Sequence, residues 1–155
     1  MHGRTVSGSP DDTAVYRLAM ALRARTFTYA VAVDRDGTAT SNEGGTPIPL
    51  EEAWTPEHLV LVGLARCTIK SLGHHARLRG LEVTSRGGAN GVVTKRDSDD
   101  RYAFVEIGLE LDVTLEPPPD DVRGLLARAE RDCFVGASLT IEPDYRWTVN
   151  GEEIQ

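Results

Sequence analysis

The sequence predicts an α+β fold in which an antiparallel sheet packs on one long central helix. Three observations carry this prediction: a capped apolar helix pattern at residues 55–80, β-rich runs on both sides of it, and a shorter helix pattern at residues 117–133. A chain of 155 residues with 40% hydrophobic content can bury one core. We therefore expect a single domain over residues 1–155.

The N-terminal part of the chain predicts one clear element. Residues 1–12 show no periodicity, and we expect them to be flexible. Residues 13–25 fit either an amphipathic helix or a strand, and the pattern does not decide between them. Residues 26–40 alternate β-forming and small side chains and turn at Asp36-Gly37, which predicts a β-hairpin at a sheet edge. A loop rich in glycine and proline follows at residues 41–54.

The long helix has clear start and stop signals. Thr55 is a good N-cap, Pro56 suits the first turn, and Glu57 complements the positive end of the helix dipole. Gly80 is the candidate residue for a left-handed C-terminal cap. The first half of the helix is apolar around most of its circumference, so we expect a sheet and a partner subunit to enclose it.

The remaining elements follow from β-rich runs and one more helix pattern. Runs at residues 81–85 and 91–116, with an acidic turn at Asp97–Asp100, predict an antiparallel strand pair. Residues 117–133 begin with proline and aspartate and predict a helix that ends at Cys133. Residues 138–151 predict a final strand.

Charge and hydropathy exclude several classes of partner. The net charge is -7 and the basic residues are dispersed, which argues against nucleic acid and against an anionic membrane surface. The longest uncharged apolar run, Leu59 to Ala65, is far shorter than the roughly 20 residues of a membrane span. No signal-peptide pattern opens the sequence. We therefore expect a cytoplasmic protein.

Cys67 and Cys133 are the two cysteines of the chain. In a reducing compartment they predict either a pair that cycles between thiol and disulfide or two unrelated buried thiols. Taken alone, Cys67 in an apolar helix is typical of a small core residue. Arg66 and Lys70 lie beside it in the sequence and would favour a reactive thiolate, although each also fits a polar stripe on the helix.

The histidines do not predict a metal site. His74 and His75 are adjacent, so on a helix their side chains point about 100° apart. Neither pairs with His58 or Cys67 at the spacing of i and i+4 that two ligands on one helix face require. A structural site needs three or four convergent ligands, and we expect none here.

The segment "TPEHLVLVGLARCT" resembles the signature helix of the OsmC/Ohr family of thiol-dependent hydroperoxide reductases. In both, a Thr-Pro-Glu type start is followed by an apolar stretch and then by a cysteine ten positions after the glutamate, here Glu57 and Cys67. The segment "LLARAERDCFVGASL" is similar to the one that bears the family's second cysteine. The order of elements matches the family over residues 26–151.

This resemblance implies the roles of four residues. Cys67 would be the peroxidatic thiol and Cys133 the resolving thiol, while Arg35 and Glu57 would be electrostatic partners of the thiolate. Arg35 is assigned because the family's arginine lies in the turn after the first strand, where Arg35 stands just before Asp36-Gly37, and Arg23 and Arg25 are the alternatives. Phe134 stands where peroxidases of the family have proline, which places the chain nearer the broader OsmC-like branch.

The resemblance also implies an activity. We expect an enzyme that reduces organic hydroperoxides with an external dithiol, such as a lipoyl group, and that needs no metal, flavin or haem. An apolar pocket lined by the central helix would favour organic hydroperoxides, because burying each methylene contributes about 0.8 kcal/mol. The alternative is a non-peroxidatic OsmC-like protein that binds a small apolar ligand or acts as a redox sensor.

Helix geometry connects this resemblance to a dimer. Glu57 and Cys67 lie about 15 Å apart along a straight helix, too far for direct contact. If both residues serve one site, a second subunit must supply one of them. We therefore expect an intertwined homodimer whose central helices pack antiparallel at Gly63, although Gly63 also fits tight packing within one chain.

Overall fold

The computed structural model describes residues 25–154 of the chain. The expectations for residues 1–12 and for residues 13–24 concern a part of the chain outside this range. The chain divides into two compact units, residues 1–50 and 51–155. Each unit is described by itself, and the single domain expected over the whole chain stays a prediction.

The described part of the first unit is a β-hairpin. Strands β1 (Val31–Val33) and β2 (Ala39–Ser41) pair antiparallel. The turn closes where the backbone N–H of Gly37 donates to the carbonyl of Asp34 at 2.9 Å. This confirms the hairpin predicted around Asp36-Gly37. Its strand residues are largely solvent-exposed in this unit, and Val31 is 76% exposed.

The long helix of the second unit is α2 (Pro56–Leu78). Thr55 precedes it with the extended backbone of an N-cap, and its hydroxyl lies 2.9 Å from His58 Nδ1. Gly80 follows the helix with φ of +71°, a left-handed conformation that glycine adopts without a steric penalty. The positions of both predicted ends are therefore confirmed, although the Thr55 side chain caps no backbone N–H of the helix.

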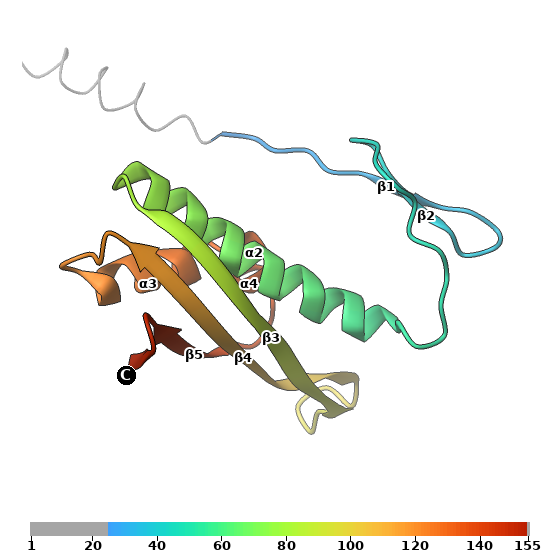
Figure 1. Ribbon diagram of the computed structural model, residues 1–155. Coiled ribbons are helices and arrows are strands. Elements are labelled where there is room, and N and C mark those ends of the chain that lie inside the picture. Colours follow the sequence, from blue (N-terminus) through green and yellow to red (C-terminus); the bar gives the residue numbers. More distant parts are fainter. Residues whose placement is uncertain (1–24, 155) are drawn as a thin grey trace, which may run out of the picture. The chain divides into compact units, whose positions relative to one another are not determined.

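Four strands form the sheet of this unit in the order β3-β4-β5-β6 (Figure 1). They are β3 (Glu82–Lys95), β4 (Tyr102–Glu116), β5 (Asp144–Val149) and β6 (Glu152–Ile154). The predicted antiparallel pair is confirmed as β3 and β4. Strands β4 and β5, however, run parallel, so the sheet is mixed. The helical segment between these two strands carries the chain back across the sheet, as a parallel pair requires.

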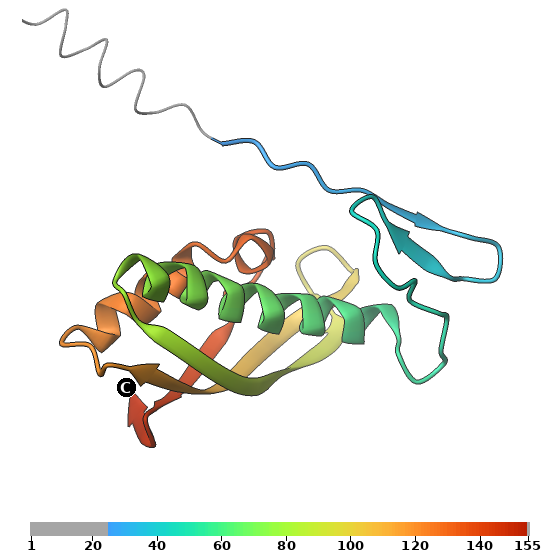
Figure 2. The same cartoon turned by 45° about the horizontal axis from the view of Figure 1, so that its top comes forward.

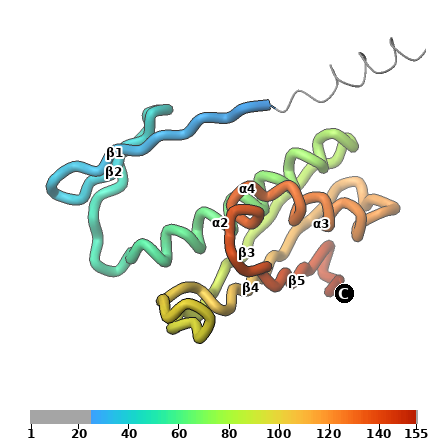
Figure 3. Tube along the Cα trace, turned by 180° about the vertical axis from the view of Figure 1, so that it is seen from behind, coloured from blue at the N-terminus to red at the C-terminus, as the bar shows by residue number. Residues whose placement is uncertain are grey.

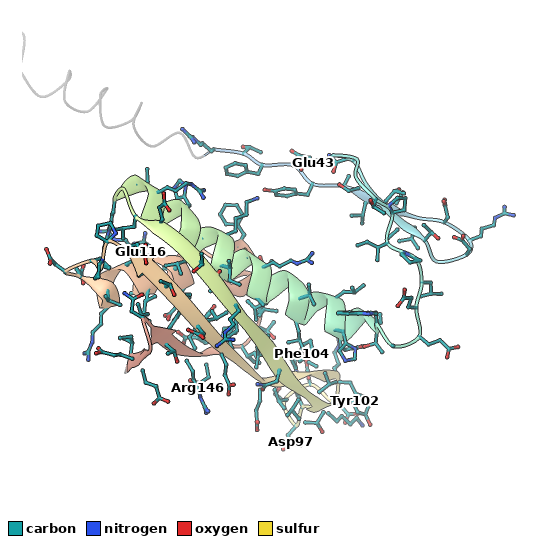
Figure 4. The ribbon with its side chains drawn as sticks, viewed as in Figure 1. Glu43, Asp97, Tyr102, Phe104, Glu116 and Arg146 are labelled. Carbon is teal, nitrogen blue, oxygen red and sulfur yellow. The ribbon has the colours of Figure 1, made fainter. Side chains whose placement is uncertain are left out.

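Strand β3 runs without a break through its glycines, where the sequence left a gap between two β-rich runs. A Cβ at Gly87 would lie 2.2 Å from the carbonyl oxygen of Glu110, so a side chain cannot be placed there. At Gly91, a Cβ would lie 2.8 Å from the ring of Phe104 on the neighbouring strand (Figure 4). The glycines therefore let β4 groups approach β3 closely instead of ending the strand.

The second predicted helix differs from the observed one at its end. Helix α3 (Val122–Arg131) begins after Asp121, whose side chain accepts a hydrogen bond from the N–H of Gly124 at 2.8 Å. It ends before Cys133, and this cysteine instead caps a separate short helix, α4 (Phe134–Ala137). The expectation of one helix ending at Cys133 was therefore wrong, because the Cys133 side chain accepts a hydrogen bond from the N–H of Gly136 and so caps a separate helical turn.

The core lies between the sheet and the helices. Helix α2 turns one face inward, at residues spaced four apart, and β4 turns alternate residues toward the same core. Figures 2 and 3 show α2 along the sheet, with α3 and α4 beside it. None of the described helices is long and apolar enough to span a membrane. The buried residues of α2 and β4 are Leu64, Thr68, Leu72, Ala76, Ile107, Leu109, Leu111, Val113 and Leu115.

Two leucines of α2 predict very different costs for the same substitution. Leu72 is fully buried, whereas Leu78 on the same helix is 72% exposed. We expect Leu72→Ala to lower the free energy of unfolding by about 2–5 kcal/mol and Leu78→Ala by less than about 0.5 kcal/mol. Denaturant unfolding of both variants measures the difference. Equal losses would contradict the packing of α2 on this core.

Candidate functional site

Cys67 lies in the middle of α2 and is partly buried against the core. Burial raises the pKa of its thiol above the usual value, and hydrogen bonding and charge at Cys133 act in the same direction. The backbone N–H groups of Val135 and Phe134 act in the opposite direction on this pKa, because they stabilise a thiolate. Within the second unit, Cys67 is thus held as a thiol.

Cys133 lies against the same turn of α2 and is fully buried. Its Sγ accepts a hydrogen bond from the N–H of Gly136 at 3.3 Å, and Thr68 Oγ1 lies 3.5 Å from it. Both cysteines are free thiols, and they interact directly. The structure therefore brings together the two cysteines that the sequence separates by 66 positions.

Two hydroxyl groups border the buried sulfur of Cys133. Thr68 donates to the carbonyl of Leu64 at 3.0 Å, one helical turn earlier, and also faces Cys133. Tyr145 comes from β5, and the Thr68 hydroxyl is near enough to its phenol to lower the tyrosine pKa. Burial raises the pKa of Tyr145 to about 12, and the nearby Cys133 adds to that rise. Sequence reasoning identified neither hydroxyl.

Glu57 lies in the first turn of α2 and is exposed. Its own backbone N–H and the Thr55 hydroxyl lower the pKa of its carboxyl group. These contacts belong to the helix start, and the length of the helix separates Glu57 from Cys67 of the same chain by about 15 Å. Its expected part in the thiol site stays a prediction.

Arg35 lies in the turn between β1 and β2 and is exposed. It belongs to the first unit, so its expected place beside Cys67 stays a prediction. Of the two alternatives, Arg25 is exposed in the same unit and Arg23 lies outside the described residues. Arg66 and Lys70, the cations nearest to Cys67 in the sequence, are exposed on α2.

A hydrogen bond between two side chains joins α2 to the chain just before Cys133. His75 Nε2 lies 2.8 Å from Asp132 Oδ2, and Arg131 Nε lies 2.8 Å from the other oxygen of the same carboxylate. Hydrogen bonding and charge from Arg131, with a smaller effect of His75, lower the pKa of Asp132. This contact helps hold Cys133 against the turn of α2 that carries Cys67.

Two hollows open on the surface of the second unit, with volumes of about 450 and 760 Å³. Gly136, Leu139 and Tyr145 line the first, beside the cysteine pair, and residues of the sheet line the second. Neither is lined by α2, so the expected apolar pocket along this helix stays a prediction. In the described part of the chain, no three His, Cys, Asp or Glu residues gather as a metal site would need.

The arrangement suits thiol chemistry at two unequal sulfur atoms. Cys67 is partly accessible, whereas Cys133 is enclosed and directly behind it. An oxidised Cys67 can therefore react with Cys133 before another thiol reaches it, and an external thiol can reach only the Cys67 side of a disulfide.

The sequence signals for the hydroxyl groups were weak, because Thr68 simply follows Cys67 and Tyr145 has the pattern of an ordinary strand residue.

Comparison with known proteins assigns the chain to a group of proteins with this fold. Residues 49–148 match the sequence model of OsmC-like proteins. An OsmC-like protein of unknown function from Vibrio cholerae aligns with a TM-score of 0.66 at 13% identity, over 79% of this chain and all of that one. No curated protein matches the sequence.

Two further solved structures show the same fold. The organic hydroperoxide resistance protein OhrB of Bacillus subtilis aligns with a TM-score of 0.51 at 21% identity, over 81% of this chain and 98% of that one. An OsmC-like protein from Mycoplasma pneumoniae aligns with a TM-score of 0.62 at 13% identity, over 81% and 97%. At these identities the likeness establishes the fold.

The ion pair at Asp132 predicts a pH-dependent contribution to stability. Because the pKa of Asp132 is lower in the folded than in the unfolded chain, its contribution is present above the unfolded value of about 4 and is lost as pH falls through the folded value. We expect Asp132→Asn to lower the free energy of unfolding by about 0.5–1 kcal/mol at pH 7, since the carboxylate is partly exposed.

The matched control is Asp97→Asn in the exposed turn between β3 and β4 (Figure 4). Denaturant unfolding between pH 7 and pH 3 measures the free energy of unfolding of each variant. The difference between Asp132→Asn and the parent should become smaller toward pH 3, while the free energy of unfolding of the control stays close to that of the parent at every pH. A deficit that persists unchanged at pH 3 would mean that the ion pair is not its cause.

Proposed function

Because the chain belongs to the OsmC-like family, we propose that it is a thiol-dependent peroxidase that reduces organic hydroperoxides. The observation that carries this proposal is the direct contact between a partly accessible Cys67 and a fully buried Cys133. Such a pair suits an oxidised thiol with its own internal resolving thiol. The name of the Bacillus subtilis relative, an organic hydroperoxide resistance protein, supports the same substrate class.

The proposed reaction has three balanced steps. The Cys67 thiolate attacks the terminal oxygen of the hydroperoxide, the O–O bond breaks, and the products are an alcohol and a sulfenic acid on Cys67. Cys133 then attacks the sulfenic sulfur, forming the S–S bond and releasing water. An external dithiol reduces the disulfide in two exchange steps and is itself oxidised to a disulfide.

The reductant in this proposal is a small dithiol such as a lipoyl group, and no metal, flavin or haem takes part. We place the protein in the cytoplasm, where a cysteine pair that cycles between thiol and disulfide can be returned to its reduced form. Substrate and reductant both approach Cys67, because Cys133 has no exposed surface.

A homodimer is part of the proposal. A Cβ at Gly63 would meet no atom within 4 Å, so tight packing within the described part of the second unit does not account for this glycine. Leu59 and Val60 on the same part of α2 are 45% and 39% exposed, and β3 is an edge strand of its sheet. A second copy would cover these apolar and unpaired surfaces.

Deprotonation of Cys67 then depends on residues outside the second unit of its own chain. Burial raises the pKa of Cys67, so a nearby guanidinium is needed to favour the thiolate at neutral pH. We assign this role to Arg35, with Glu57 of the partner chain orienting the guanidinium. This assignment rests on the family resemblance and on the length of α2.

The raised pKa of Cys67 favours a second candidate function. A thiol that stays protonated would serve as a packing residue or a slow redox sensor, in a protein that binds a small apolar ligand. The two functions differ in the alkylation rate of Cys67 at pH 7. In a peroxidase, an alkylating reagent modifies Cys67 rapidly while the protein is folded. A structural thiol is modified only after the protein unfolds.

The peroxidase proposal predicts different fates for the two cysteine variants. With organic hydroperoxide and dihydrolipoamide, we expect steady turnover by the parent and none by Cys67→Ser. In Cys133→Ser, Cys67 should be oxidised once and proceed to sulfinic acid, because the resolving thiol is missing. Turnover assays and peptide mass mapping measure both results. A parent that forms no disulfide with any organic hydroperoxide would overturn the proposed activity.

The dimer predicts complementation between inactive chains. Cys67→Ser and Glu57→Ala are each expected to lose activity as homodimers, because each damages both composite sites. In a mixed dimer one site carries both defects and the other carries neither, so activity should return to about half of the parent value per mixed dimer. Subunit exchange is confirmed with differently tagged chains. Mixed dimers that stay inactive would place Glu57 and Cys67 in the same chain's site or exclude Glu57 from the chemistry.

A further inference from the structure

The buried sulfur of Cys133 lies in a small polar site within an apolar core. Three groups define it: the N–H of Gly136, at 3.3 Å from Sγ, the hydroxyl of Thr68, at 3.5 Å, and the hydroxyl of Tyr145 behind them. A Cβ built on Gly136 would lie 3.0 Å from the Tyr145 hydroxyl and 3.4 Å from Cys133 Sγ. The tyrosine hydroxyl and the sulfur therefore border the same narrow space.

The Thr68 hydroxyl has one hydrogen and two acceptors within reach. It lies 3.0 Å from the carbonyl oxygen of Leu64 and 3.5 Å from Cys133 Sγ. The Leu64 carbonyl already takes part in the helix, so it does not depend on Thr68 for a partner. When negative charge develops on the sulfur, the hydrogen can turn toward it, because hydrogen bonds to charged acceptors are the stronger ones.

The Tyr145 ring is held so that its hydroxyl faces Thr68. It stacks on Trp147, with ring centroids 6.5 Å apart and planes 9° apart, and the indole N–H of Trp147 donates to Glu130 Oε1 at 2.7 Å. Burial raises the pKa of Tyr145 to about 12, so the phenol keeps its proton at neutral pH and can act as a donor. A phenol that donates to Thr68 Oγ1 leaves the threonine hydrogen available for the sulfur.

We infer that Thr68 stabilises negative charge on Cys133 Sγ whenever the Cys67–Cys133 disulfide forms or breaks, and that Tyr145 acts through Thr68 as a positioning residue. This inference rests on the proposed function for its place in the catalytic cycle. Its chemistry concerns only the disulfide, which any suitable oxidant can form.

The same sulfur carries the charge in both directions of the cycle. When the disulfide forms, Cys133 attacks Cys67 as a thiolate; the S–O bond of the sulfenic acid breaks, and the leaving hydroxide takes a proton to become water. When a dithiol reduces the disulfide, its thiolate attacks Cys67, because only this side is accessible. The S–S bond breaks, its electron pair goes to Cys133 Sγ, and that sulfur then takes a proton.

This asymmetry explains why hydroxyl groups are placed at Cys133. A thiolate that forms in full burial has no water to solvate it, and an unpaired buried charge is costly. The N–H of Gly136 supplies one hydrogen bond, and Thr68 supplies the second. Losing a hydrogen bond to a charged group corresponds to a rate loss of about tenfold or more.

The test uses the full-length protein with its disulfide preformed by diamide, so that no peroxide is needed. Reduction by dithiothreitol at pH 7 is followed by stopped flow for the parent, Thr68→Val, Thr68→Ser and Tyr145→Phe. We expect Thr68→Val to slow reduction about tenfold or more, Thr68→Ser to stay within about threefold of the parent, and Tyr145→Phe to fall between them. Tyr102→Phe is the matched control, because Tyr102 is 74% exposed.

A structural defect is separated from the inferred role by two further readouts. Denaturant unfolding reports whether each variant is folded, and recovery of the rate in Thr68→Ser shows that the hydroxyl and not the side-chain volume matters. If Thr68→Val does not fold, the comparison of Tyr145→Phe with Tyr102→Phe decides. Equal reduction rates in folded Thr68→Val and the parent, equal rates for the two tyrosine variants, or failure of diamide to link Cys67 with Cys133 would each overturn the inference.

Failure of the proposed function has a different outcome. A parent that never reduces a hydroperoxide, but whose diamide-formed disulfide is reduced more slowly in Thr68→Val, would refute the peroxidase and leave the role of Thr68 intact. Under the peroxidase, the same variant should also accumulate more Cys67 sulfinic acid for each equivalent of hydroperoxide, because resolution by Cys133 is slower.

Discussion

The burial of Cys133 beneath α2 is the constraint on which the second unit depends. A thiol with no exposed surface must find its hydrogen bonds inside the protein, and here it finds them at Gly136 and Thr68. The first contact starts α4 directly after the cysteine, and the second fixes the turn of α2 that carries Cys67. One buried sulfur thus sets both the end of α3 and the position of the partly exposed thiol.

The same constraint extends into the sheet. After α4 the chain crosses back and enters β5 parallel to β4, and this places Tyr145 and Trp147 on the core side of the sheet, behind the cysteines. An antiparallel return from β4 would have needed only a short turn and would have left no segment to carry Cys133 under α2. The mixed sheet is therefore linked to the formation of the thiol pair.

Local signals predicted those features of the fold that local physics determines. Thr55, Pro56 and Gly80 mark the ends of α2, because capping and left-handed backbone depend on a few neighbouring residues. The parallel pair of β4 and β5 and the separate helix α4 were missed, because they depend on contacts between distant segments. The family resemblance identified both cysteines, but the hydroxyls of Thr68 and Tyr145 belong to this chain's own packing and have no sequence motif.

The partly exposed thiol raises a physical requirement that the second unit does not meet alone. Desolvation of Cys67 favours the neutral form, and the nearby backbone N–H groups do not outweigh it. An efficient peroxidase needs the thiolate, so a positive charge must come from elsewhere in the assembled protein. Taken by itself, the second unit also leaves apolar residues of α2 exposed and the edge of β3 unpaired. If one association both covers these surfaces and delivers the charge, Cys67 becomes reactive only in the assembled protein, and the isolated unit keeps an inert thiol.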